Sequence, residues 1–98
     1  PYAYVEPSQV RVERYGSAKT NNLAFTLYNP QNTSRRVRLR LNREELALPL
    51  SIQVKEWLND TPVSVSNRDA TLELSLDIQC EDYAMITVDS TNPDTNSR

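Results

Sequence analysis

Alternation of apolar and polar residues recurs along most of the chain, and it constrains the fold more than any other feature. Successive side chains of a β-strand point to opposite faces, so this period of two is typical of half-buried strands rather than helices. It recurs at residues 10–13, 23–27, 36–41, 52–55, 72–79 and 84–88, and a short stretch at 63–65 could add one more. We expect the core to consist of Val10, Val12, Leu23, Phe25, Leu27, Val37, Leu39, Leu41, Ile52, Val54, Leu72, Leu74, Leu76, Ile86 and Val88.

Residues that favour turns separate the alternating stretches, chiefly Asn, Asp, Pro and Ser. Short strands at this spacing predict an all-β fold, an antiparallel immunoglobulin-like β-sandwich of six to eight short strands. One connector, residues 42–48, has a helical pattern of one or two turns. Asn42 is its expected cap, with Glu45 at the third position, and Pro49 is expected to end it.

The chain of 98 residues has room for one domain. We assign residues 9–88 to the β-sandwich. Residues 1–8 contain Pro1 and Pro7, and the chain begins at Pro1 rather than Met. We therefore expect residues 1–8 to be a lead-in or linker from a missing upstream domain. Residues 89–98 contain no large apolar side chain, and we expect a flexible polar tail.

The composition argues against catalysis within this domain. The chain has no histidine, one cysteine and one glycine, which excludes a Ser-His-Asp relay, an internal disulfide and a glycine-rich phosphate loop. The adjacent acids Glu44–Glu45 and Glu81–Asp82 are sequence neighbours, whose side chains usually point apart. We therefore predict no catalytic residue, no cofactor and no metal, and the domain itself is not expected to be an enzyme.

The charges are nearly balanced, with 11 Lys and Arg against 13 Asp and Glu and a net charge of −2. Nucleic-acid-binding modules usually carry a basic excess, so no nucleic-acid partner is expected. No apolar run approaches the roughly 18–20 residues that span a bilayer, so no membrane span is expected. The compartment stays open, with a secreted, periplasmic or cell-surface location favoured over a cytoplasmic one.

The most conspicuous polar feature is the alternation of Arg36, Arg38 and Arg40, which we call the arginine stripe. On one strand these side chains leave the same face about 6.6–7 Å apart. They either bind an anionic partner, such as an acidic polysaccharide or a carboxylate-rich neighbouring domain, or pair with Glu73 and Asp77 on another strand. We favour the second interpretation because both acids have the same outward parity.

Aromatic residues provide the other candidate surface. Trp57 is out of phase with the alternation of residues 52–55, which predicts a bulge or a strand end just before it. If exposed, Trp57 is a carbohydrate platform or an interdomain anchor; we favour burial at one end of the sandwich. Tyr2, Tyr4 and Tyr15 are candidates for an aromatic face that docks on another domain.

The order of sequence cues resembles a known family. These cues are residues 13–16 (ERYG), 25–30 (FTLYNP), 37–39 (VRL), 46–49 (LALP), 54–60 (VKEWLND) and 82–88 (DYAMITV). Across residues 9–88 they are similar to the small β-sandwich domains that follow a (β/α)₈ barrel at the C-terminal end of many multidomain glycoside hydrolases. One departure is Asn59-Asp60, which stands where that family usually has glycine; both residue types tolerate the left-handed backbone.

The resemblance implies a non-catalytic accessory domain that packs against an upstream catalytic domain of the same chain and stabilises it. In those enzymes the catalytic acids lie on the barrel, so no catalytic residue is carried over. Two alternatives stay open. One is a carbohydrate-binding module that uses Trp57 or a tyrosine platform, and the other is an independent protein-interaction or adhesion domain that uses an exposed strand edge.

Overall fold

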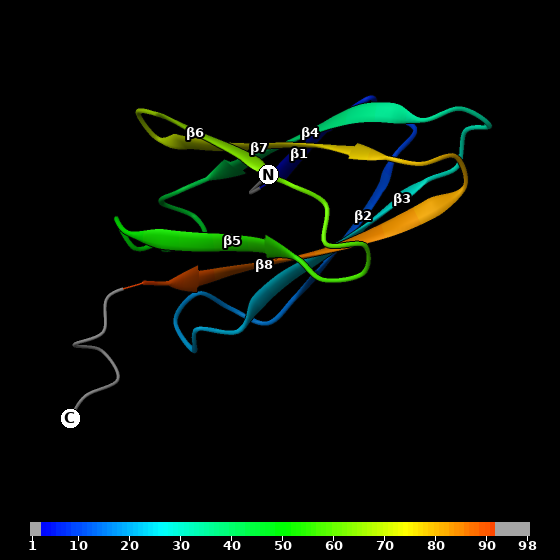
Figure 1. Cartoon of the computed structure of the whole chain (residues 1–98). Helices are drawn as coiled ribbons and strands as arrows, with labels where there is room; N and C mark the ends of the chain where they lie inside the picture. The colour runs from blue at the N-terminus through cyan, green and yellow to red at the C-terminus, as the bar shows by residue number, and fades with distance from the viewer. Residues whose placement is uncertain (1–2, 92–98) are drawn as a thin grey trace.

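The computed structural model describes residues 3–91, and these residues form two antiparallel four-stranded sheets packed face to face as a sandwich (Figure 1). The strands are β1 (Ala3–Glu6), β2 (Arg11–Tyr15), β3 (Leu23–Asn29), β4 (Arg35–Asn42), β5 (Ile52–Glu56), β6 (Ser64–Arg68), β7 (Thr71–Ile78) and β8 (Asp82–Ser90). One sheet has the order β1-β4-β7-β6 and the other β2-β3-β8-β5. The predicted all-β, immunoglobulin-like β-sandwich is confirmed.

The core lies between the sheets and is formed by the inward-facing side chains that the alternation predicts. Val12, Ile52 and Val54 are only partly buried. They lie on β2 and β5, the two edge strands of their sheet, and each of these strands has a neighbouring strand on one side only. The other predicted core residues are buried. The structure also buries Leu46, Ile78 and Ala84.

Two corners cross between the sheets side by side, one joining β3 to β4 and the other joining β7 to β8 (Figure 1). Asn29, fully buried at the end of β3, connects them. Its Nδ2 atom donates to the carbonyl oxygens of Thr33 at 2.9 Å, Ile78 at 3.1 Å and Gln79 at 3.0 Å. These bonds hold the β3–β4 corner against the β7–β8 corner, and so fix the position of one sheet relative to the other.

The chain ends differ from the boundaries that the sequence predicts. Residues 3–6, expected in a linker, pair with β4 as an edge strand, with Ala3 and Val5 packed against the core. Strand β8 continues to Ser90, two residues into the expected tail. Residues 1–2 and 92–98 lie outside the described part of the chain.

The predicted helical connector is a single turn. The Leu46 amide donates to the Asn42 carbonyl at 3.1 Å, and the Glu45 amide donates to Asn42 Oδ1 at 3.0 Å, which is the predicted cap. Ala47 then adopts a left-handed backbone with φ 54°, which ends the turn before Pro49 is reached. Within residues 3–91, no helix is long and apolar enough to cross a membrane.

Candidate binding surfaces

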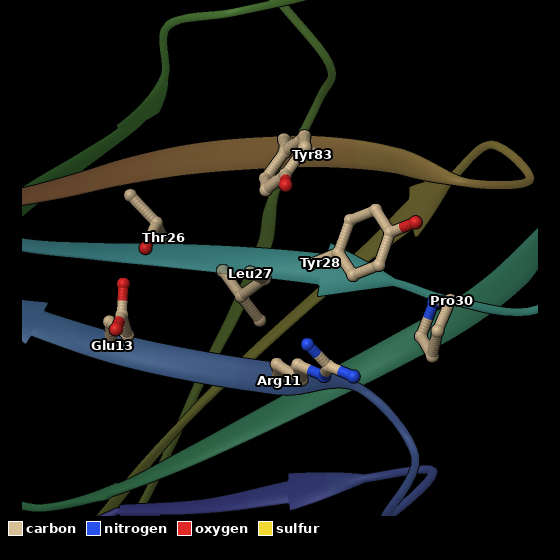
Figure 2. A pocket seen from close by; sticks show the side chains of 7 residues that line it. All are labelled: Arg11, Glu13, Thr26, Leu27, Tyr28, Pro30 and Tyr83. Atoms are coloured by element: carbon tan, nitrogen blue, oxygen red, sulfur yellow. The ribbon is translucent and has the colours of Figure 1, made fainter.

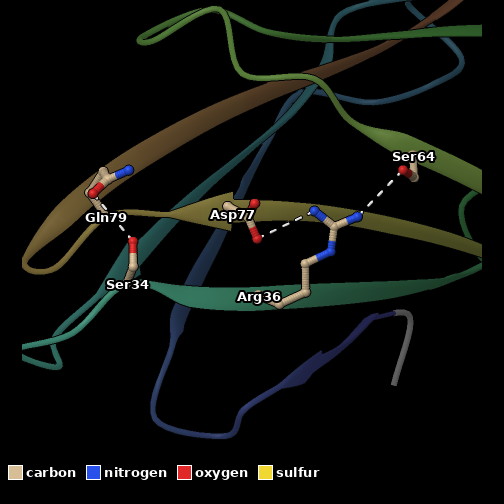
Figure 3. A network of polar contacts seen from close by, with 5 residues as sticks. All are labelled: Ser34, Arg36, Ser64, Asp77 and Gln79. Atoms are coloured by element: carbon tan, nitrogen blue, oxygen red, sulfur yellow. Dashed lines mark hydrogen bonds and ion pairs between the residues drawn. The ribbon is translucent and has the colours of Figure 1, made fainter.

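The outer face of the β1-β4-β7-β6 sheet carries charged side chains. The arginine stripe lies on β4, with Glu73 and Asp77 opposite on β7. Arg36 Nη1 lies 3.3 Å from Asp77 Oδ1, and Arg40 Nε donates to Glu73 Oε1 at 3.0 Å. Figure 3 shows Arg36 reaching Asp77 and, at 3.5 Å, the Ser64 hydroxyl on β6. The predicted pairing across the strands is therefore confirmed for Arg36 and Arg40.

The electrostatic consequence is clearest at Arg40 and Glu73. The hydrogen bond from Arg40 lowers the pKa of the Glu73 carboxyl from its ordinary value, and the same bond raises the pKa of Arg40. Arg40 also lies 3.5 Å from Glu6 Oε1 on β1. Two carboxylates thus offset its charge, which weakens the case for an anion site at this end of the stripe.

Arg38, in the middle of the stripe, is exposed, and its side chain has no ion pair among the described residues. It lines a shallow hollow of about 250 Å³ together with Glu6, Pro7, Arg35 and Arg36. Glu6 places a carboxylate in that hollow, so the local positive potential is partly cancelled. The arginine stripe is mainly a solvated, ion-paired face.

The outer face of the β2-β3-β8-β5 sheet is different, and we call it the aromatic face: Tyr15, Tyr28, Trp57 and Tyr83. Tyr28 on β3 is the register partner of both Arg11 on β2 and Tyr83 on β8. The rings of Tyr28 and Tyr83 are in contact, with centroids 4.6 Å apart and planes inclined at 35°. Tyr83 is still 54% exposed, so much of its surface is open to a ligand.

Beside these rings lies a hollow of about 550 Å³, which we call the tyrosine hollow (Figure 2). It is lined by Arg11, Glu13, Thr26, Leu27, Tyr28, Pro30 and Tyr83. Figure 2 shows the Arg11 guanidinium near Tyr28 and Pro30, while Glu13 lies toward the other end beside Thr26. The hollow therefore combines aromatic surface with a cation, a carboxylate and a hydroxyl.

Trp57 is 52% exposed, and the expectation that it is buried is wrong. The cause is strand parity. Strand β5 ends at Glu56, which points inward in phase with Ile52 and Val54, so Trp57 turns to the outer face with Lys55. The Lys55 Nζ atom lies 4.2 Å from the indole ring centroid, and Trp57 Nε1 donates to Thr87 Oγ1 on β8 at 2.8 Å.

Glu56 occupies the inward position and is 1% exposed. Its Oε1 accepts from the amides of Asn59 at 2.9 Å and Thr61 at 3.0 Å, and its Oε2 from those of Leu58 at 2.7 Å and Met85 at 3.2 Å. Burial alone would raise the pKa of Glu56, but these backbone donors outweigh it and lower the pKa below its ordinary value. The carboxylate thereby fixes the segment that follows Trp57.

The structure does not bring Tyr4 and Tyr15 together. Tyr4, 70% exposed, lies on β1 beside Arg40, on the outer face that carries the arginine stripe. Tyr15, 51% exposed, lies on β2 in the opposite sheet. The reason is that the chain crosses from one sheet to the other between β1 and β2. Tyr2 lies outside the described residues.

Sequence reasoning missed the residues that meet in the tyrosine hollow. Arg11, Tyr28 and Tyr83 each have outward parity on their strands, and that signal was available. Their proximity depends on the pairing of β3 with both β2 and β8, which joins residues far apart in the sequence. Alternation identifies a face for each strand but does not say which strands are neighbours.

Within the described part of the chain, no group of three or more His, Cys, Asp or Glu residues is placed to hold a metal ion. The single cysteine, Cys80, is exposed and free. Comparisons with protein-family models, with curated proteins and with solved structures found no match for this chain.

Proposed function

We propose that the chain is a non-catalytic carbohydrate-binding module and that the aromatic face is its ligand-binding surface. The observation that supports the proposal is the placement of half-exposed Tyr83 and Trp57 on one face, with polar side chains beside them: Thr87 beside Trp57, and Glu13 and Thr26 in the tyrosine hollow. The C–H groups of a sugar ring pack on aromatic rings, while its hydroxyls need hydrogen-bond partners. A buried protein interface, by contrast, has few charged residues at its centre.

The two exposed aromatic residues occupy nearby positions on one face. The Trp57 amide donates to the Met85 carbonyl at 2.8 Å, so Trp57 stands beside Met85 across the β5–β8 ladder. Tyr83 is two residues along β8 and is therefore a diagonal neighbour, about 7–8 Å away at the Cα atoms. The indole is held by its bond to Thr87 and the phenol by its contact with Tyr28. Both rings are thus oriented before any ligand arrives, which lowers the entropic cost of binding.

The test is a glycan array followed by affinity electrophoresis in gels containing the glycans that bind. We expect Tyr83→Ala and Trp57→Ala each to weaken retention at least tenfold. Tyr4→Ala is the matched control, because Tyr4 is an aromatic residue on the opposite outer face and is even more exposed than Tyr83 and Trp57. Equal losses in all three variants, or no retention of any glycan by the unmodified chain, would contradict the proposal.

A second candidate is the accessory packing domain that the sequence resemblance implies. Its specific support is the exposure of Leu50, at 94%, and Leu58, at 57%, which flank the edge strand β5. Sugars make little use of such aliphatic side chains, whereas a neighbouring protein domain would cover them. The reading frame upstream of Pro1 tests this candidate: a barrel domain there supports it, and a free-standing gene contradicts it.

A further inference from the structure

The tyrosine hollow contains a cation whose side chain is not engaged by the protein, and this points to the class of its ligand. Resting on the proposed function, we propose that the tyrosine hollow selects an acidic sugar, a uronic acid unit whose carboxylate pairs with Arg11 while its ring packs on Tyr83. Uronic acids offer both features that the hollow can recognise, a ring with C–H faces and a fixed planar carboxylate.

Arg11 lines the tyrosine hollow. It is exposed, and its guanidinium forms no hydrogen bond or ion pair within the described residues. Figure 2 shows it extended along the hollow toward Tyr28 and Pro30. The planar guanidinium donates two parallel hydrogen bonds to a carboxylate, a match that neutral hydroxyls do not offer. An unengaged arginine beside an aromatic platform therefore favours an anionic sugar.

The other basic side chains serve as an internal comparison. Arg36 and Arg40 are occupied by Asp77 and Glu73, and Lys55 lies over the Trp57 ring. Arg38 is exposed without an ion pair, but no aromatic residue lines its hollow. Arg11 alone among these five combines an unengaged cation with an aromatic lining.

Glu13 sets the orientation of the ligand. It is two residues from Arg11 on the same face of β2, about 7 Å away, and its Oε1 accepts from the Tyr15 hydroxyl at 2.9 Å. Its negative charge repels a carboxylate from that end of the hollow, while its free lone pairs accept from sugar hydroxyls. The acid group is therefore directed to the end formed by Arg11 and Pro30, and hydroxyls to the end formed by Glu13 and Thr26.

The experiment compares uronic acid oligosaccharides with their carboxyl-reduced counterparts, which keep the same linkage and ring stereochemistry without the charge. Oligogalacturonate, oligoglucuronate and oligomannuronate are titrated into the chain by calorimetry. We expect at least one acidic oligosaccharide to bind ten times more tightly than its reduced form, and this preference to weaken at high salt because the ion pair is exposed. Arg11→Gln should abolish the preference.

The matched control is Arg38→Gln, which removes an exposed, unpaired arginine from the opposite outer face and should leave the preference intact. Melting curves of both variants confirm that they are folded.

Loss of the preference in Arg38→Gln but not Arg11→Gln would overturn the inference and place acid binding on the arginine stripe. Equal binding of acidic and reduced oligosaccharides, weakened by Tyr83→Ala, would overturn the inference while the proposed function stands. No binding of either form would overturn the inference as well; if the glycan array also found no ligand, the proposed function would fall with it.

Discussion

Among single residues, Glu56 has the largest effect on the surface around Trp57. An acid in the inward phase of a strand violates the alternation, and because Glu56 takes the inward position, Trp57 is exposed rather than buried. The carboxylate is tolerated because four backbone amides donate to it, which replaces the water that it loses. One buried acid thus orders a loop and keeps an aromatic ring on the surface.

We predict that Glu56→Gln lowers the free energy of unfolding by about 2–4 kcal/mol, because an amide accepts on one side only and leaves backbone donors unpaired. The folded-state pKa of Glu56 is lowered, so its stabilisation is present above the unfolded value of about 4.3 and is lost as the pH falls through the folded pKa. Glu73, whose pKa is also lowered, contributes in the same direction.

Denaturant titrations between neutral pH and about pH 3 measure the free energy of unfolding and its dependence on pH. The stability of Glu56→Gln should fall less with decreasing pH than that of the unmodified chain. Glu13→Gln, at an exposed site on β2, is the control and should change neither quantity appreciably. An unchanged pH dependence in Glu56→Gln would show that the buried carboxylate does not stabilise the fold.

At the scale of strands, the sequence predicts the elements well and their neighbours poorly. Alternation located the strands from residues 10 to 88 because each buries one face, and that preference is local. Strand β1 was missed because only Ala3 and Val5 alternate in it, which is too short a pattern to separate from an extended linker. The tyrosine hollow was missed because it depends on strand order, which long-range packing decides.

Asn29 joins the two cross-sheet corners through its side-chain amide. We predict that Asn29→Ala destabilises the chain by about 2–3 kcal/mol, because the buried carbonyl of Ile78 and the partly buried carbonyl of Gln79 lose their side-chain donor. Hydrogen exchange should accelerate most at the β7–β8 corner. Asn32→Ala, an exposed change in the neighbouring corner, is the control, and an equal effect there would contradict the assignment.

At the scale of the whole molecule, the sandwich has one core and two chemically different outer faces. The core consists of side chains that each contribute roughly 1.5–3 kcal/mol on burial, and conformational entropy cancels most of this sum. Such a domain is only marginally stable. The outer faces add little to stability, so their side chains can differ without loss of the fold. The β1-β4-β7-β6 sheet carries ion pairs on its outer face, and the β2-β3-β8-β5 sheet carries the aromatic face.

The marginal stability gives a sharp prediction for the core. Leu74, fully buried on β7 between Leu39 and Val65 in register, should not tolerate a charge, and Leu74→Asp should abolish cooperative thermal unfolding. Leu50→Asp makes the same chemical change at a side chain that is 94% exposed and should stay within about 0.5 kcal/mol of the parent. A cooperative transition in Leu74→Asp would contradict the strand register.

We propose that carbohydrate binds to the aromatic face and not to the outer face that carries the arginine stripe. The most direct measurement is a ¹H–¹⁵N chemical-shift titration of the chain with the oligosaccharide that binds best. We expect shifts concentrated on β2, β3 and β8 around Arg11, Tyr28 and Tyr83, together with the Trp57 indole signal. Shifts confined to β4 and β7 around the arginine stripe, or no shifts with any glycan, would contradict the proposal.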